Sequence, residues 1–284
     1  MEDRLTPLIA ERAPWLYRGG LPARVLKPLL DRMLRYRECV EIGTKLDPLS
    51  AEDIMVDLQG RLSRHVIARG LGNIPASGPA LIVANHPTGI ADAIMLNHAL
   101  SAIRSDAYYF ANRDIMRVMP QFDTMIAPVE WRLEKRSHAK MKETMSFTRQ
   151  AVDEGRLGVI FPSGRLAKRR GIRLYERPWM ASAAMIARKF DLPVIPVNIR
   201  ARNSALFYLF DLLHPTLRDI TLFYETLNKD RQPYHITVGE PISAASLPKN
   251  SDEAIEILRR ETLRLGEPGL TLVSRKMRPA SASS

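Results

Sequence analysis

The stretch ANHPTGIADAIML places a histidine and an aspartate around one short turn. His86 and Asp92 have five residues between them, and they stand where an apolar, strand-like run gives way to a helical pattern. Pro87 stiffens the turn and Gly89 permits a sharp bend, so Asp92 could fold back towards His86. A carboxylate bonded to one imidazole nitrogen fixes the tautomer and leaves the other nitrogen able to take a proton from a hydroxyl.

The same residues have purely structural interpretations. A histidine at a strand end is often only part of the hydrogen-bonded frame, and an aspartate near a helix start is often a cap. No other histidine stands at a spacing that would join His86 as a metal ligand, so we predict no metal site. A nucleophilic serine is not predicted either, because FPSGR at 161–165 lacks the leading glycine of a G-x-S-x-G elbow. General-base chemistry at His86 is therefore one interpretation of this turn, beside a structural one.

The composition suits one large globular domain or a domain with a small appendage. Hydrophobic residues make up 45% of the 284, and the single Cys39 excludes an internal disulfide framework, which favours a reduced cytoplasmic setting. The formal net charge of +11 favours a polyanionic partner, such as an anionic membrane or a phosphorylated small molecule. The charged N-terminal stretch is not typical of a signal peptide, and no uncharged apolar run approaches the roughly 20 residues of a membrane span.

Beyond Gly60, short apolar runs alternate with helical patterns. This alternation predicts an α/β fold with a mixed, largely parallel sheet flanked by helices. We predict an N-terminal helical membrane-surface segment over 1–60, an α/β domain over 61–275 and a flexible tail over 276–284. The predicted strands are HVIARG, PALIVANH, DAYYFAN, TMIAPV, LGVIFPS and LPVIPVNIR, followed by ITLFYE and YHITVGEPI.

Two apolar helical patterns could face a lipid surface. From Ala23, ARVLKPLLDRMLRYRECV predicts one basic amphipathic helix, which either packs on the domain or lies on a membrane. A following helix is expected to begin after Ser50, whose hydroxyl would cap it. The run ALFYLFDLL at 205–213 is most commonly a core helix, although it could also line an acyl-chain groove or touch lipid.

Three blocks carry a family resemblance: NHPTGIAD, FPSGRLAKRR and LPVIPVNIR, in this order. They resemble the glycerolipid acyltransferase family that includes 1-acylglycerol-3-phosphate acyltransferase, over about residues 70–242. FANRDIM, RARNSALFYLF, LFYETLNK and VGEPIS are similar to the branch with ornithine-lipid and hemolysin-like acyltransferases. The resemblance implies that His86 deprotonates an acceptor hydroxyl, which attacks an acyl thioester directly, while Asp92 orients the imidazole. It implies no cofactor and no covalent acyl-enzyme, with acyl-CoA or acyl-acyl-carrier-protein as the co-substrate.

The sequence departs from the family pattern twice. The usual motif has four residues between histidine and aspartate, whereas this chain has five. The block usually written Phe-Pro-Glu-Gly-Thr-Arg here reads Phe-Pro-Ser-Gly-Arg, so its acidic residue is missing and its arginine comes one place early. A strongly basic segment follows, which suits a phosphate or a lipid head group. APVEWRLEKRS resembles the family block whose arginine binds the acceptor phosphate, which implies an acceptor contact at Arg132. The turn and the basic segment after it add the predicted acceptor contacts Ser163, Gly164, Arg165 and Lys168.

The sequence thus predicts an acyltransferase that acylates a lysolipid hydroxyl. The acceptor is either 1-acylglycerol-3-phosphate or a lyso-ornithine lipid, and the expected location is the cytoplasmic face of an anionic membrane. The alternative is a non-catalytic lipid-binding protein of the same fold. Nucleic acid is not predicted as a partner, because only Tyr175 and Trp179 accompany the basic segment, and both follow its charges.

Overall fold

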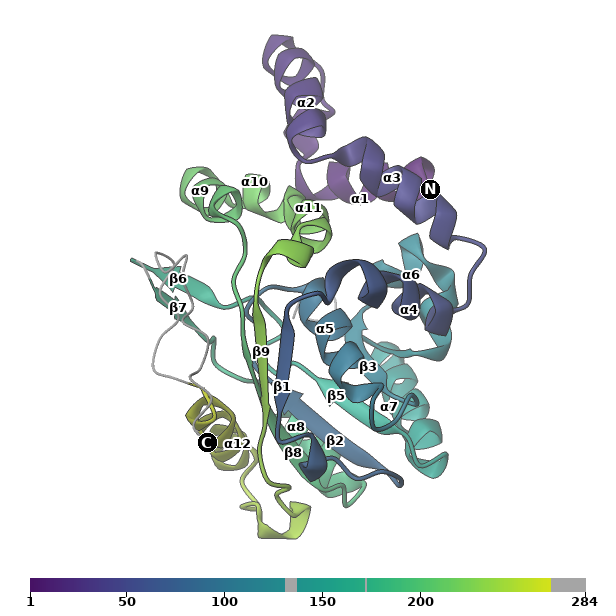
Figure 1. The fold of residues 1–284 in the computed structure, drawn as a ribbon, viewed down its shortest axis with the longest axis vertical. Coiled ribbons are helices and arrows are strands. Elements are labelled where there is room, and N and C mark those ends of the chain that lie inside the picture. Colours follow the sequence, from purple (N-terminus) through teal and green to yellow (C-terminus); the bar gives the residue numbers. More distant parts are fainter. Residues whose placement is uncertain (131–136, 172, 267–284) are drawn as a thin grey trace.

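A seven-stranded sheet forms the centre of the molecule in the computed structural model, which describes residues 1–130, 137–171 and 173–266 (Figure 1). The strand order is β1-β9-β8-β2-β5-β3-β4. All neighbouring pairs run parallel except β8 and β9, which are antiparallel, so the sheet is mixed and largely parallel as predicted. The strands are β1 (Val66–Arg69), β2 (Ala80–Ala84), β3 (Tyr108–Asn112), β4 (Ile126–Val129), β5 (Leu157–Ile160), β8 (Val194–Arg200) and β9 (Tyr234–Val238).

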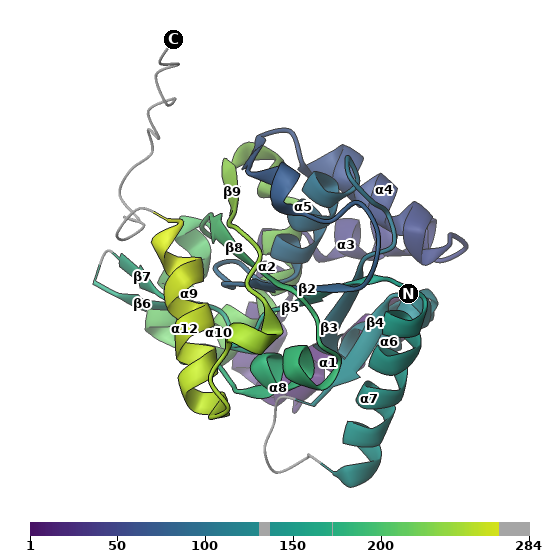
Figure 2. The same cartoon turned by 90° about the horizontal axis from the view of Figure 1, so that it is seen from below.

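Helices cover both faces of this sheet. On one face lie α4 and α5, and on the other α7, α8 and α12 (Figure 2). The remaining helices lie towards one end of the molecule, and among the described residues no helix is both long and apolar enough to cross a membrane. The helices are α1 (Glu2–Arg12), α2 (Leu21–Met33), α3 (Tyr36–Leu46), α4 (Ala51–Leu62), α5 (Ile90–Leu100), α6 (Asp114–Val118), α7 (His138–Asp153), α8 (Ser182–Lys189), α9 (Ala205–Leu213), α10 (Pro215–Ile220), α11 (Leu222–Leu227) and α12 (Ser251–Arg264).

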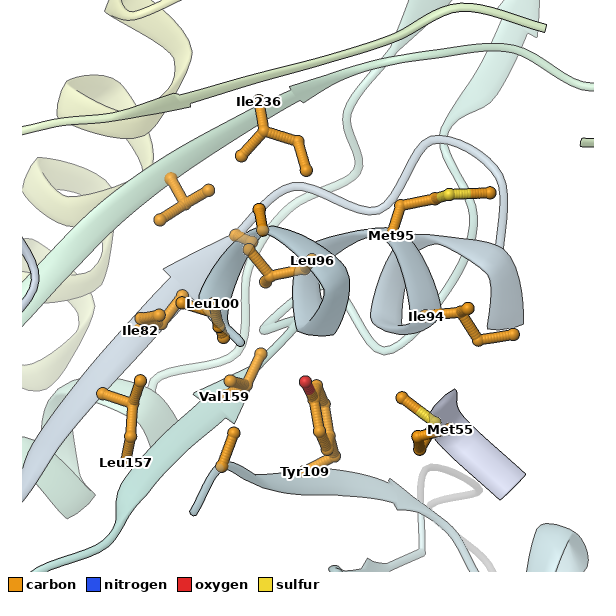
Figure 3. Packing of buried hydrophobic residues seen from close by; sticks show 14 of the residues in the cluster. Met55, Ile82, Ile94, Met95, Leu96, Leu100, Tyr109, Leu157, Val159 and Ile236 are labelled. Carbon is orange, nitrogen blue, oxygen red and sulfur yellow. The ribbon is translucent and has the colours of Figure 1, made fainter. Parts of the chain in front are cut away.

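The central strand β2 explains why the sheet needs cover on both faces. Its five residues are all fully buried, and successive side chains point to opposite faces. Ile82 packs with Leu96 and Leu100 of α5 on one face (Figure 3), whereas Leu81 and Val83 belong to the cluster on the other. Burial of a Leu or Ile side chain of this kind contributes about 1.5–3 kcal/mol, which fixes β2 at the centre of the sheet.

A third apolar cluster holds the N-terminal helices against the helices that follow β8. It includes Leu30 and Leu34 of the α2 segment, Phe210 of α9 and Ile220 of α10. These helices lie at the same end of the molecule, and α2 extends beyond them (Figure 1). The predicted division of the chain at residues 60 and 61 stays a prediction, and the predicted tail at 276–284 lies outside the described residues.

Two sequence-based predictions of secondary structure are wrong. The single helix predicted from Ala23 is interrupted at Arg35, whose φ of +54° is left-handed, so α2 ends and α3 begins. Leu30 on one side of the break belongs to the third cluster, whereas Leu46 of α3 belongs to the cluster that includes α4 and α5. ITLFYE is not a strand, because α11 occupies Leu222–Leu227. The predicted Ser50 cap is confirmed, since its hydroxyl accepts the N–H of Asp53.

Candidate active site

The end of β2 carries the histidine to the carboxyl edge of the sheet. Asn85 continues the pairing with β8 beyond the strand end, because its side-chain amide donates to the Ile199 carbonyl at 2.8 Å and accepts the Ile199 N–H at 2.6 Å. His86 follows directly, at the edge where ligands usually gather in parallel sheets. Its ring stacks on Phe161, the residue that follows β5, with 4.4 Å between the ring centroids.

The structure brings His86 and Asp92 together despite the five intervening residues. Nδ1 of His86 lies 3.0 Å from Oδ2 of Asp92, whose side chain is completely buried. The ring N–H is not aligned along this line, so the contact is a close polar approach instead of a formed hydrogen bond. Catalytic hydrogen bonds are commonly misaligned before substrate binds, so this geometry is compatible with an imidazole oriented by a carboxylate. The His86 side chain stays 19% exposed although Nδ1 is buried, so a reactant could reach the rest of the ring.

Asp92 is fixed by the turn that precedes it. Its carboxylate accepts the Thr88 N–H at 2.8 Å, the Thr88 hydroxyl at 2.6 Å and the Gly89 N–H at 3.0 Å. Asp92 is the third residue of α5, and its bond to Gly89 is half of a capping box. Gly89 has a φ of +101°, a conformation open to glycine, and this bend accommodates the additional residue. The carboxylate is therefore held rigidly beside the imidazole.

A buried network of hydrogen bonds connects this turn to Tyr234, Asn203 and Lys229. The Thr88 hydroxyl also bonds the phenol of Tyr234, and burial raises the pKa of that phenol well above its usual value. The Thr88 carbonyl faces the side-chain amide of Asn203 at 3.4 Å. The oxygen of that amide accepts from Nζ of Lys229 at 2.8 Å. The turn between His86 and Asp92 is thus connected to residues that follow β8 and α11.

Lys229 and Glu225 form an ion pair that solvent does not reach. Nζ of Lys229 lies 2.7 Å from Oε2 of Glu225, and the two side chains are 0% and 1% exposed. Burial lowers the pKa of Lys229, and the charge of Glu225 opposes that shift. Glu225 also accepts the N–H of Ser204 at 2.9 Å and its hydroxyl. Glu225 lies on α11 and Lys229 four residues later, just beyond the end of that helix, so the predicted strand ITLFYE is replaced by a helix whose glutamate pairs with the following turn.

The block after β5 forms a turn and then a two-stranded hairpin, β6 (Lys168–Arg170) and β7 (Arg173–Tyr175). Ser163 is buried and its hydroxyl donates to the Arg165 carbonyl at 2.8 Å. Gly164, Arg165 and Lys168 are exposed, and the N–H of Ala167 donates to the His86 carbonyl at 2.9 Å. The structure therefore ties this block to the main chain of His86. The predicted contact Arg132 lies outside the described residues.

Glu176 was not among the predicted site residues. This partly buried carboxylate directly follows β7 and accepts the N–H of His86 at 3.3 Å and the indole N–H of Trp179 at 2.9 Å. Burial raises the pKa of Glu176, and its interactions with Trp179, His86 and Ser163 oppose that rise. The signal was a lone acidic residue between a basic segment and a tryptophan, which by itself predicts nothing about position.

Comparison with known proteins places these residues in a family. The family described as Acyltransferase matches residues 65–200, which include both members of the His86–Asp92 pair and the Ser163–Lys168 block. No curated protein gave a match. One similar solved structure is titled the 1-acyl-sn-glycerophosphate (LPA) acyltransferase, PlsC, from Thermotoga maritima; its TM-score is 0.49 at 13% identity, covering 85% of this chain and 95% of that chain. By this match residues 65–200 form an acyltransferase domain, which supports the glycerolipid acyltransferase family.

Proposed function

We propose that this acyltransferase transfers a fatty acyl group from acyl-CoA or acyl-acyl-carrier-protein to the hydroxyl of a lysolipid, with His86 as the general base. One observation carries the proposal: Nδ1 of His86 lies 3.0 Å from the buried carboxylate of Asp92 at the carboxyl edge of the sheet, inside the acyltransferase match. A base held by a carboxylate is the arrangement that deprotonation of a hydroxyl needs.

The proposed reaction uses one imidazole twice. Nε2 of His86 takes the proton of the acceptor hydroxyl while that oxygen attacks the thioester carbonyl, which gives a tetrahedral intermediate. The intermediate collapses with cleavage of the carbon–sulfur bond, and the imidazolium returns the proton to the leaving thiolate. The products are an ester and a free thiol. Asp92 holds Nδ1–H and stabilises the positive charge while it exists.

A direct transfer is supported by the state of the single cysteine. Cys39 lies on α3, and burial raises the pKa of its thiol to about 12. A thiol with that pKa is almost wholly protonated near neutral pH and is a poor nucleophile. Ser163 donates its hydroxyl proton to a carbonyl, so it is not aimed at His86. These two side chains favour attack by the acceptor over a covalent acyl-enzyme.

The exposed basic residues suit an anionic head group. Arg165 and Lys168 lie at the start of the hairpin, next to the segment bonded to the His86 carbonyl. A phosphomonoester and a carboxylate are both ligands that guanidinium and ammonium groups bind well. We therefore keep 1-acylglycerol-3-phosphate and lyso-ornithine lipid as the two acceptors for direct comparison.

Two exposed apolar helix faces support docking on a membrane surface. On α2, Val25 and Leu29 are 64% and 57% exposed, with Arg24 and Arg32 beside them. On α9, Leu212 and Leu213 are 66% and 63% exposed, and both helices contribute to the third cluster at the same end of the molecule (Figure 1). Apolar side chains flanked by cations are the composition that binds an anionic lipid interface. We propose peripheral attachment at the cytoplasmic face through this end.

A thiol-release assay tests the proposed function. Palmitoyl-CoA and palmitoyl-acyl-carrier-protein would each be offered with lysophosphatidic acid or lyso-ornithine lipid, and wild type compared with His86→Ala. Acceptor-dependent release should fall by about 10²–10⁴-fold in the variant, because general-base proton transfer is lost. The matched control is His98→Ala, an exposed histidine on α5. Folded wild-type protein that binds lyso-lipid vesicles but releases no thiol with any pair would favour the non-catalytic lipid-binding alternative.

A further inference from the structure

Glu176 is a carboxylate that the proposed chemistry does not use, although it contacts the main chain of the proposed base. We infer that Glu176 is a positioning residue, which fixes the His86 main chain against the turn after β5 and so sets the direction of the imidazole. This inference rests on the proposed function for its kinetic consequence. The contact between Glu176 and the His86 main chain does not depend on the proposed function, because it is present in the folded protein.

The contacts of Glu176 join three separate segments. One carboxylate oxygen, Oε2, accepts the N–H of His86 at the end of β2, at 3.3 Å. The other, Oε1, accepts the indole N–H of Trp179, at 2.9 Å, just before α8. The buried hydroxyl of Ser163 is a third neighbour. A single side chain thus connects β2, the turn after β5 and the segment leading to α8.

The position of Glu176 complements the composition of the turn after β5. That turn, Phe161 to Arg165, contains the buried Ser163 and no carboxylate of its own. The hairpin of β6 and β7 reverses the chain, so that Glu176 returns to Ser163 after twelve intervening residues. Ala167 N–H and His86 carbonyl bond at 2.9 Å, so both main-chain polar groups of His86 are held by the 163–176 segment.

A carboxylate performs this role better than an amide. The two donors, the N–H of His86 and the indole N–H of Trp179, approach different oxygens of Glu176. Glutamine has one carbonyl oxygen, so its NH₂ group would oppose one of those donors. The side chain is partly buried, and an unpaired donor there is unfavourable. Glu176→Gln therefore removes the bridge with little change in volume.

The first arm of the test is kinetic. In Glu176→Gln, kcat should fall by about 10- to 100-fold, because a small displacement of a catalytic group has a cost of that order. The KM values for both substrates should stay within about threefold, since the side chain does not hold substrate in this assignment. The matched control is Glu240→Gln, an exposed glutamate beyond β9, which should leave both constants unchanged.

The second arm is a rescue. Trp179→Phe removes the indole donor and keeps an aromatic ring, so in the double variant Glu176→Gln/Trp179→Phe the amide oxygen is free to accept the His86 N–H. The double variant should recover part of the lost kcat relative to Glu176→Gln alone. If only the charge of Glu176 mattered, or if Glu176→Gln merely destabilised the fold, the double variant should recover none of the lost kcat.

The third arm does not depend on activity. Hydrogen exchange at the His86 amide should be faster in Glu176→Gln than in wild type, while exchange in α12 should not change. Unchanged exchange at His86, an unchanged kcat, or a raised KM with kcat retained would each overturn the assignment. If wild type transfers no acyl group, the proposed function fails, and the exchange arm still decides whether Glu176 holds His86.

Discussion

Two segments leave neighbouring parallel strands at the same edge of the sheet, and they are built in opposite ways. The turn after β2 is closed: Thr88 and Asp92 are 2% and 0% exposed, and the Asp92 carboxylate accepts three donors from its own turn. The segment after β5 opens into a hairpin whose Lys168, Arg170 and Arg173 are exposed. In the proposed function, the rigid buried turn carries out proton transfer and the accessible hairpin binds the charged head group.

The two environments also differ in how charge acts. A charge buried without water interacts strongly with its partner and is weakly screened, whereas exposed cations are screened within about 8–10 Å at physiological salt. Substitutions in or under the buried turn after β2 should therefore lower the free energy of unfolding or kcat. Substitutions in the hairpin should instead weaken lipid binding in a salt-dependent way. The three changes below test that division, beginning with the largest expected effect.

Lys229→Met should lower the free energy of unfolding by about 3–5 kcal/mol, because it leaves Glu225 buried without its charged partner. Urea denaturation followed by circular dichroism measures this change. The matched control is Lys249→Met, an exposed lysine before α12, which should stay within about 0.5 kcal/mol of wild type. Adding Glu225→Gln to Lys229→Met should restore part of the loss. A loss below about 1 kcal/mol in the single variant would contradict a buried ion pair beneath the turn.

Asp92→Asn should reduce acyl transfer by at least about 100-fold, because an amide oxygen cannot hold the imidazole and also accept all the donors of the turn. The measurement is kcat in the thiol-release assay, with circular dichroism to verify the fold. Asp191→Asn, an exposed aspartate between α8 and β8, is the control. If a folded Asp92→Asn variant kept the wild-type kcat, Asp92 would be only a helix cap. The turn after β2 would then have no role in proton transfer through this carboxylate.

Much of the closed turn could be predicted from sequence, since its parts are local. The alternation of apolar runs predicted the sheet, and the Pro and Gly between His86 and Asp92 predicted a bend that could return the carboxylate to the ring. The support beneath the turn could not be predicted. Asn203 and Lys229 lie more than a hundred residues from Thr88, and only the folded sheet brings them together.

The same limit explains the errors elsewhere. ITLFYE has strong strand propensity, but the segment forms α11, whose Glu225 is buried against Ser204 and Lys229, so the folded environment overrode local preference. No strand was predicted in the basic segment, whereas β6 and β7 pair there at three positions. Glu176 was not predicted for a related reason. The hairpin that brings it to His86 could not be predicted, because the sequence has no strong turn signal there besides Gly171.

The smallest expected effect belongs to the open hairpin. Replacing Lys168 and Arg170 by Gln should weaken binding to anionic vesicles by about fivefold per residue at low salt, since each near-surface cation contributes about 1 kcal/mol. The Tm should hardly move, because both side chains are exposed. The measurement is vesicle co-sedimentation with phosphatidylserine at two salt concentrations, with Arg260→Gln on α12 as the exposed control.

The hairpin variants also test whether the hairpin affects the turn after β2. If it does not, kcat with a detergent-dispersed acceptor stays at the wild-type value. High salt should also remove the difference in vesicle binding, because exposed charges are screened. A large loss of kcat in detergent would instead mean that the hairpin positions the catalytic turn as well as binding lipid. Glu176 and Ala167, at the two ends of the hairpin, both bond the His86 main chain. A loss of kcat in detergent would therefore mean that Lys168 and Arg170, which lie on β6, affect the position of His86 through the hairpin.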